Sequence, residues 1–421
     1  MPIDTTAVAA LREEPLDWRF KAAPLRTPGG AGTVGEYLSG RPTLADFGTP
    51  LLTLERRAVD HNVATMAAYT EAAGASLAPH GKTTMAPALW MRQLAAGAWG
   101  ITLANLPQLR VARSFRVSRL MLVTSLLDPA GLAWLGAQLD DDPGFSFTCW
   151  ADSVRSVEIM DSALRAAGTG RPVDVCVELG APGGRTGVRD EDEAVAIAGA
   201  VRAAPTLRLA GVAGYEGTLG HDASATSLTA VDAFLKRMAA LYDHLEYEVD
   251  EPIVTAGGSA YFDQVVDVLG DAGPRLVLRS GAYIVHDDGF YRAVSPLVRG
   301  AGPVPFRSAM HAWARVVSRP EPGLALLDAG KRDLPFDEGL PEPQIVRGRN
   351  GPMLAGARVT ALSDQLTFLA LDPGSDLGCG DVVRLGLSHP CTAFDKWAMI
   401  PVVDDVDADD PEVVDMVRTY F

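Results

Sequence analysis

Residues 77–87 read L-A-P-H-G-K-T-T-M-A-P, and they show how the rest of the chain is built. A short apolar run ends at a proline, a histidine and a glycine, and Lys82 follows directly. This is the pattern of a lysine at the end of a buried strand. Burial lowers the pKa of a lysine and favours the free amine, which is the state that a Schiff-base lysine needs. A structural ion pair at a strand end is the competing interpretation.

The stretch around residue 77 is the first of eight similar units. The expected strands lie near residues 76–79, 99–103, 119–124, 145–149, 173–179, 207–213, 252–256 and 275–279. Segments with helical spacing of apolar residues separate them, among them 86–96, 106–114, 153–167, 190–203, 227–244 and 261–268. This alternation predicts a parallel sheet with crossover helices, and eight units favour an α/β fold of the closed (β/α)8 TIM-barrel type. An open doubly wound sheet is the alternative, but no G-x-G-x-x-G opens a helix to support it.

A change of composition near residue 300 predicts a second domain. Proline and glycine become dense, and short strand-like runs follow at 312–317, 324–327, 344–346, 359–363, 366–370 and 382–387. These runs predict a mostly antiparallel β domain. Ahead of the barrel, a strand is expected at 50–54 and a helix at 57–73. The expected division is a barrel over 45–298 and a β domain over 1–44 and 299–421, and the acidic segment 404–410 is expected to be solvated.

The charge balance and the cysteines narrow the class of protein. The 421 residues include 37 Lys and Arg against 53 Asp and Glu, so the net charge is −16. A chain this acidic is a poor partner for nucleic acid or an anionic membrane. Its four cysteines are sparse and irregularly spaced, which is typical of a reduced intracellular protein. Without a secretory segment or a long uncharged apolar run, a cytoplasmic protein is expected.

Candidate site residues follow the expected strands, because barrel chemistry lies at the C-terminal strand ends. Lys82 follows the first strand, Arg185 lies in the glycine-rich loop 180–188 after the fifth, and Tyr215 follows the sixth. The turns after the last two strands contain Gly257, Gly258, Ser259, Arg279, Gly281 and Ala282. Turns at these two positions often hold a phosphate with backbone N–H groups. A phosphate-bearing carbonyl cofactor opposite a lysine fits this pattern, although tight turns alone also require glycine.

One more cluster lies in the second domain, at residues 386–392, G-L-S-H-P-C-T. If this run is extended, the side chains of His389 and Cys391 lie on the same side. An imidazole and a thiolate at this spacing can be two ligands of a zinc ion, with open positions left for water or substrate. Simple packing is the competing interpretation.

These motifs together resemble those of a known family. The runs are P-H-G-K-T-T at 79–84, G-R-T-G-V at 184–188, G-G-S at 257–259 and S-H-P-C-T-x-F-D-K-W at 388–397. They resemble the D-serine dehydratase/D-threonine aldolase family of fold-type III pyridoxal-phosphate enzymes, relatives of alanine racemase. The resemblance spans residues 49–401. The chain departs from it at Thr84 and Met85, where family members typically have a histidine and a second lysine.

The resemblance implies a role for each candidate. Lys82 would bind the aldehyde of pyridoxal phosphate, and Arg185 would lie near its phenolic oxygen. Either Tyr215 or Arg279 would face the pyridine nitrogen, a choice that the sequence leaves open. The phosphate would be held by Gly257, Gly258, Ser259, Gly281 and Ala282. His389 and Cys391 would bind a divalent metal, with zinc expected.

The resemblance also implies a reaction, the elimination of water from a 3-hydroxy D-amino acid to give a 2-oxo acid and ammonia. Lys82 would act as the base, and the metal would polarise the β-hydroxyl group. Retro-aldol cleavage uses the same parts, but the family's aldolases tend to have aspartate in place of Cys391. A racemase would need a second base that no motif supplies, and a non-catalytic cofactor carrier would lack the second domain. A homodimer with an amino acid as its small-molecule partner is implied.

Overall fold

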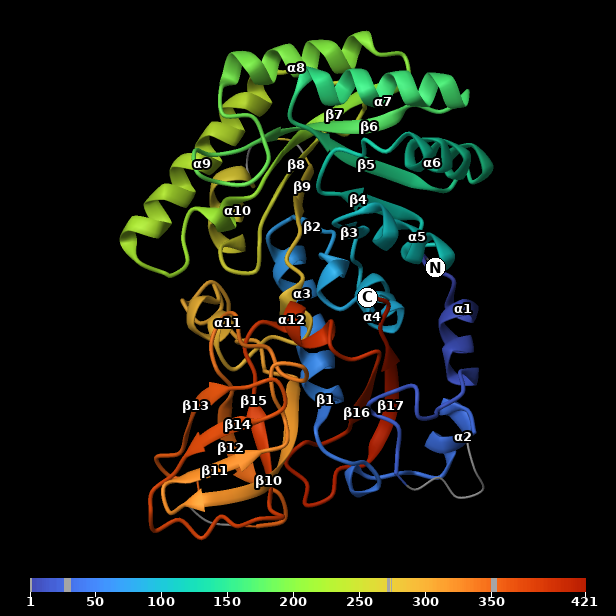
Figure 1. The fold of residues 1–421 in the computed structure, drawn as a ribbon. Coiled ribbons are helices and arrows are strands. Elements are labelled where there is room, and N and C mark those ends of the chain that lie inside the picture. Colours follow the sequence, from blue (N-terminus) through green and yellow to red (C-terminus); the bar gives the residue numbers. More distant parts are fainter. Residues whose placement is uncertain (1, 26–31, 271–272, 274, 350–353) are drawn as a thin grey trace.

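The computed structural model describes residues 2–25, 32–270, 273, 275–349 and 354–421. Its first sheet has eight parallel strands (Figure 1). They are β2 (Ser76–Leu77), β3 (Ile101–Leu103), β4 (Arg119–Leu122), β5 (Ser146–Ala151), β6 (Val173–Leu179), β7 (Leu207–Gly214), β8 (Ile253–Ala256) and β9 (Arg275–Leu278). Each lies where a barrel strand was predicted, so the predicted TIM-type fold is confirmed.

The barrel closes between its first two strands. The sheet order runs from β2 through β9 and back down to β3. The Trp99 N–H donates to the Leu77 carbonyl at 2.6 Å, and the Thr102 N–H donates to the Pro79 carbonyl at 3.0 Å. Buried side chains from the strands, Trp150 and Cys176 among them, fill the interior. The barrel is therefore a packed core whose strand ends are held rigidly.

Helices cover the outside of the barrel (Figure 1). They are α4 (Pro87–Ala95), α5 (Leu106–Ser114), α6 (Pro129–Asp141), α7 (Val154–Ala167), α8 (Glu191–Ala203), α9 (Ala225–His244) and α10 (Phe262–Leu269). Side-chain caps begin several of them, because an oxygen before the first turn satisfies free N–H groups. Asp128 caps α6, Ser153 caps α7 and Asp190 caps α8. The helix α6 was not predicted, since its apolar and glycine-rich sequence has no clear polar face.

The second sheet has nine mostly antiparallel strands, which confirms the predicted β domain. They are β1 (Leu51–Glu55), β10 (Met310–Glu321), β11 (Leu324–Leu327), β12 (Glu342–Val346), β13 (Arg358–Leu362), β14 (Thr367–Ala370), β15 (Val382–Gly386), β16 (Met399–Val403) and β17 (Val413–Arg418). The strand β1 pairs with β10 and β16. It therefore hydrogen-bonds in the second sheet, although the expected division at 44/45 places it on the barrel side. The division itself stays a prediction.

Short helices join the parts. The N-terminal segment forms α1 (Thr5–Ala9), η1 (Ala10–Glu13), α2 (Val34–Ser39) and η2 (Leu44–Asp46). The helix that was predicted at 57–73 is α3 (Arg56–Ala72), which leads from β1 of the second sheet to β2 of the barrel. Its buried Asn62 donates to the carbonyls of Ile284 and Arg307 and accepts the Arg307 N–H at 2.8 Å. The start of the β domain is thus pinned to α3.

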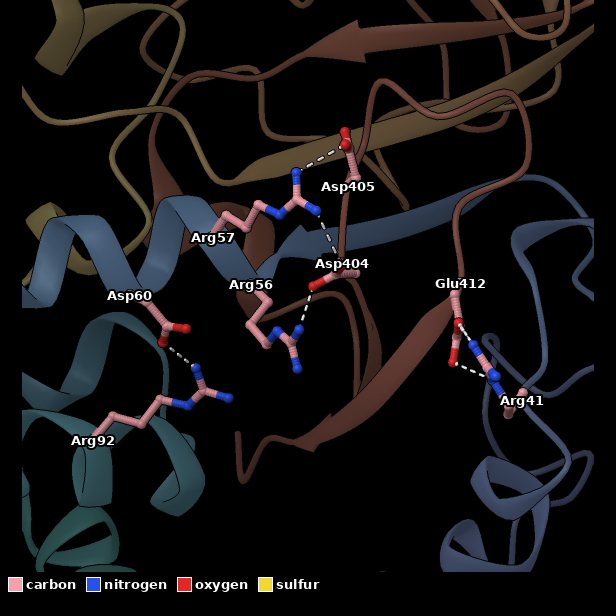
Figure 2. A network of polar contacts seen from close by, with 8 residues as sticks. All are labelled: Arg41, Arg56, Arg57, Asp60, Arg92, Asp404, Asp405 and Glu412. Atoms are coloured by element: carbon pink, nitrogen blue, oxygen red, sulfur yellow. Dashed lines mark hydrogen bonds and ion pairs between the residues drawn. The ribbon is translucent and has the colours of Figure 1, made fainter.

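The acidic segment 404–410 was expected to be solvated, and residues 407–410 are exposed, although Val406 is buried. It turns between β16 and β17, and four arginines from three parts of the chain pair with it. Asp404 pairs with Arg56 and Arg57, and Arg57 also reaches Asp405 at 2.9 Å (Figure 2). Arg384 pairs with Asp407, and Arg347 pairs with Asp410. The sequence showed the run of aspartates but not the cations that fold against it.

Membrane insertion finds no support in the helices. Within the described ranges, none combines the length and the apolar character that a membrane-crossing helix requires.

Candidate active site

Lys82 lies in a single turn, η3 (Gly81–Thr83), directly after β2. Its side chain is half-buried, and within the described residues its Nζ atom has no hydrogen bond or ion pair. Burial lowers the pKa of Lys82; the nearby Cys391 opposes this shift, and the charges of Arg185 and Arg279 add to it. Lys82 is thus a partly buried lysine near the first strand end, and the competing ion pair is absent among the described residues.

Arg185 lies in an exposed loop after β6 that its neighbours hold in shape. The guanidinium group of Arg189 donates to the carbonyls of residues 184–187. The Thr186 hydroxyl donates to Glu178 at 2.9 Å. The Arg185 guanidinium lies 5.2 Å from the centre of the Tyr215 ring. The loops after β6 and β7 thus bring an arginine and a tyrosine together, as the strand-end rule predicted.

Tyr215 and Arg279 differ sharply in accessibility. The Arg279 side chain is 6% exposed, and it donates to the Thr255 hydroxyl at 2.7 Å and to the Gly214 carbonyl at 2.6 Å. Two of its three guanidinium nitrogens are therefore engaged inside the barrel. Tyr215 is 37% exposed, and within the described residues its hydroxyl has no hydrogen-bond partner. Of the two candidates for the pyridine nitrogen, Tyr215 has the free polar group.

The glycine turns after β8 and β9 differ in detail from the expectation. The N–H groups of Gly257 and Gly258 donate to the carboxylate of Glu216, at 3.1 and 2.6 Å. The Ala282 N–H donates to the Ser259 hydroxyl at 3.2 Å. Within the described chain, the N–H groups of Ser259 and Gly281 have no backbone or side-chain acceptor. Of the five residues expected to hold the phosphate, these two therefore have N–H groups available to an anion.

His389 and Cys391 do not lie on an extended run. Pro390 begins a one-turn helix, α12 (Pro390–Phe394), and His389 precedes it with a left-handed φ of 47°. The expected extended geometry is wrong because proline at the first helical position favours a helix start. The pair still meets the barrel, since the Cys391 thiol donates to the Thr83 hydroxyl at 3.5 Å. Figure 1 shows α12 between the two sheets.

Two aspartates hold His389 in place. Asp287 accepts the His389 N–H at 3.0 Å. Asp337 lies 2.6 Å from the His389 Nδ1 atom and also accepts the Thr392 hydroxyl at 2.7 Å. A carboxylate at Nδ1 is how metal-binding histidines are commonly oriented. Here the ring also hydrogen-bonds the Cys391 side chain. Burial lowers the pKa of His389, but the bonds with Cys391 and Asp337 outweigh this and raise it to about 9. Sequence reasoning missed both aspartates, as well as Glu216 and Glu178.

The donor set at α12 fits a divalent cation. Burial opposes ionisation of Cys391, yet hydrogen bonds with His389 and Thr83 and the charges of His389 and Lys82 hold its pKa below the usual value. A thiolate beside an imidazole is a pair of ligands that zinc accepts. Across the described ranges, no group of three or more His, Cys, Asp or Glu is arranged to hold a metal. Any ion here would have open positions.

Comparisons with known proteins identify the family. Residues 54–267 match the alanine racemase N-terminal domain family, and residues 309–403 match the serine dehydratase domain family. D-threonine aldolase of Arthrobacter sp is 30% identical over 369 residues, which cover 86% of this chain and 90% of that protein. The chain belongs to the D-serine dehydratase/D-threonine aldolase family. This family consists of fold-type III pyridoxal-phosphate enzymes. The chain is therefore a pyridoxal-phosphate lyase of the class that acts on 3-hydroxy D-amino acids.

Solved structures agree with this family assignment. D-threonine aldolase from Filomicrobium marinum superposes with a TM-score of 0.76 at 26% identity, covering 90% of this chain and 96% of that one. A cysteine-to-alanine variant of D-threo-3-hydroxyaspartate dehydratase in the metal-free form superposes with a TM-score of 0.71 at 21% identity, covering 90% and 99%. At this low identity, the second structure shows that the fold is shared and nothing more.

The residues at the barrel mouth fit the family's cofactor. Lys82 supplies an amine without a partner among the described residues, and the N–H groups of Ser259 and Gly281 can donate hydrogen bonds to a phosphate. A Cβ atom at Gly281 would lie 2.6 Å from the His80 carbonyl oxygen, so only glycine permits this close approach beside the lysine turn. Burial keeps the pKa of His80 well below its usual value, so this neighbouring ring is neutral.

Proposed function

We propose that the protein eliminates water from a 3-hydroxy D-amino acid, giving a 2-oxo acid and ammonia, with pyridoxal phosphate and a divalent metal, zinc being the expected ion. One observation carries the proposal. The Cys391 thiol of the β domain lies 3.5 Å from the hydroxyl of Thr83, which is next in the chain to Lys82 of the barrel. This contact supports placing the proposed base and the proposed metal ligands on neighbouring segments of the two domains.

Lys82 is the proposed base. Its Nζ atom would take the proton from Cα of the substrate, a role that requires the neutral amine. When bound, pyridoxal phosphate supplies the electron sink for the charge left at Cα. Lys82, Arg185 and Tyr215 would hold its ring side. The turns at 257–259 and 281–282 would hold its phosphate, chiefly through the Ser259 and Gly281 amides.

His389 and Cys391 are the proposed metal ligands. A metal held there supplies a Lewis acid for the β-hydroxyl, which as hydroxide is a poor leaving group. Asp337 would orient the His389 ring, and Asp287 would fix the His389 backbone.

Retro-aldol cleavage is the second candidate, favoured by the printed names of the relatives. Both the Arthrobacter protein and the Filomicrobium structure are D-threonine aldolases. In that reaction the Cα–Cβ bond breaks, and the base must act on the β-hydroxyl proton. Cys391 favours elimination over this alternative only through the family pattern at that position.

The products distinguish the two reactions. Purified holoprotein is incubated separately with D-serine, D-threonine and 3-hydroxy-D-aspartate, with the L-isomers as controls. Elimination releases ammonia together with pyruvate, 2-oxobutyrate or oxaloacetate. Glycine and an aldehyde as the only products would replace elimination by the aldolase reaction, and an L-amino acid formed from its D-isomer would indicate a racemase.

The assembly is also a proposal. We expect a homodimer, on the family resemblance alone. A single chain already brings its own α12 against its own η3, so the Lys82 side and the His389 side of the site do not require a second copy to meet. Molecular mass in solution, measured by light scattering, tests the dimer.

A further inference from the structure

Glu216 is a fully buried acid that the proposed reaction does not use. It follows Tyr215 at the end of β7, and its side chain is 0% exposed. Both carboxylate oxygens accept backbone N–H groups, Oε2 from Gly257 at 3.1 Å and Oε1 from Gly258 at 2.6 Å. A buried carboxylate is costly unless such bonds satisfy it, so this contact has a structural consequence.

The contact joins three strand-end turns. Glu216 comes from the turn after β7 and accepts two hydrogen bonds from the turn after β8. The turn after β9 is tied to the same place, because the Ser280 hydroxyl lies 2.9 Å from the Gly257 carbonyl and 3.2 Å from the Gly258 carbonyl. The Ala282 N–H then returns to the Ser259 hydroxyl at 3.2 Å. The turns after β8 and β9 are the two that are expected to hold the cofactor's phosphate.

Gly257 and Gly258 allow the turn after β8 to lie close to the Glu216 carboxylate. A Cβ atom at Gly258 would lie 3.0 Å from Tyr215 Cε2 and 3.2 Å from Glu216 Oε1. Gly257 has a φ of 90°, a left-handed conformation that glycine adopts readily. The two glycines therefore allow the turn to fold onto the acid. This explains the G-G-S motif without requiring its first two amides to touch a phosphate.

The charge of Glu216 has a buried partner. Burial lowers the pKa of Arg279, and the nearby Glu216 charge is the largest influence that opposes this. The carboxylate is thus stabilised by two amides and by a neighbouring guanidinium charge. A carboxylate would repel a phosphate in direct contact, so Glu216 must act from behind the turn.

We propose that Glu216 is a positioning residue for the phosphate of the cofactor. By engaging the Gly257 and Gly258 amides, it orients the turn so that the Ser259 and Gly281 amides face the anion. The inference rests on the proposed cofactor site and adds to it the residue that shapes its phosphate end.

The test separates the phosphate from the rest of the cofactor. Apoprotein is titrated with pyridoxal phosphate and with pyridoxal, which has the same aldehyde and ring but no phosphate. Glu216→Gln keeps the shape of the side chain. Its amide NH2 replaces one of the two oxygens, so one of the Gly257 and Gly258 N–H groups faces a donor and loses its acceptor. We expect it to weaken binding of pyridoxal phosphate about tenfold or more, with pyridoxal affinity unchanged. Glu246→Gln, at an 80% exposed acid paired with Arg202 at 3.0 Å, is the matched control and should bind both as wild type does.

Three outcomes would overturn the inference. Unchanged binding of both compounds by Glu216→Gln would show that the acid does not act on the phosphate turn. An equal loss for both would show a general structural role. Failure of the wild type to bind pyridoxal phosphate would remove the proposed cofactor itself. If Glu216→Gln does not fold, Ser280→Ala decides, since loss of its bonds to the same turn should also selectively weaken pyridoxal phosphate.

Discussion

The two sides of the candidate site are built in different ways. On the barrel side, Tyr215 and Gly257 come directly after parallel strands and Lys82 lies in the turn η3 that follows β2, so the sheet itself brings them together. On the β-domain side, Cys391 lies on a one-turn helix and His389 directly precedes it, and side chains from distant segments hold both in place. The barrel side depends on backbone register, and the β-domain side depends on a few hydrogen bonds. Cofactor binding should therefore withstand changes that remove the metal.

The largest effect is expected from Lys82→Ala, on the barrel side. Without its amine, the Cα proton has no base, and general base catalysis contributes about 10² to 10⁴ in rate. We expect kcat to fall by at least that factor and the visible absorbance of the bound cofactor to change. The measurement is 2-oxo acid release together with an absorbance spectrum. Lys236→Ala, at an exposed lysine paired with Asp232 at 2.7 Å, is the matched control. Retained turnover in Lys82→Ala would rule out the proposed base.

A smaller effect is expected from His389→Ala, on the β-domain side. Loss of one of two protein ligands should release the metal, and a Lewis acid at a poor leaving group is worth several kcal/mol. We expect kcat to fall about 10²-fold or more, while pyridoxal phosphate binding stays within about twofold of wild type, a difference of less than 0.5 kcal/mol. Metal content by mass spectrometry and cofactor titration measure the two sides separately. Loss of the cofactor along with the metal would show that the two sides are not independent.

The contrast also explains which parts could be predicted from the sequence. The strands alternate regularly with helices, and each strand end fixes the place of the next residue, so Lys82 and Tyr215 could be assigned to the barrel mouth. The partners of His389 could not, because Asp337 lies 52 residues away and Asp287 lies 102 residues away. Glu216 could be seen as a residue after a strand, but its use of two glycine amides depends on how the turns pack.

A loss of metal affinity, without a change on the barrel side, is expected from Asp337→Asn. Asparagine keeps the size of the side chain but removes the charge that fixes the His389 ring through Nδ1. Loss of such a partner typically weakens metal binding about 10- to 100-fold. Competition with a chromophoric chelator measures this, and pyridoxal phosphate affinity should not change. Asp376→Asn, at a 67% exposed acid paired with Arg349, is the control. Equal metal affinity in Asp337→Asn and wild type would mean that Asp337 does not orient the ligand.

The last effect is expected on the barrel side, in the pH dependence of stability rather than in activity or metal binding. Burial raises the pKa of Glu178 to about 7 from 4.5, and its bond from Thr186 only partly opposes this. The folded protein therefore binds this proton more tightly than the unfolded chain does. The contribution to stability is fully present below pH 4.5 and is lost as the pH rises through about 7.

Glu178→Gln removes this titration. Relative to the variant, wild type should lose up to about 3 kcal/mol of unfolding free energy between pH 4.5 and pH 8. Urea denaturation across this range measures the difference, with the 58% exposed Glu158→Gln as the control. Parallel curves for wild type and Glu178→Gln would mean that the barrel tolerates this charge without cost. A difference that widens with pH would show that the rigid side of the site is held partly by a neutral acid.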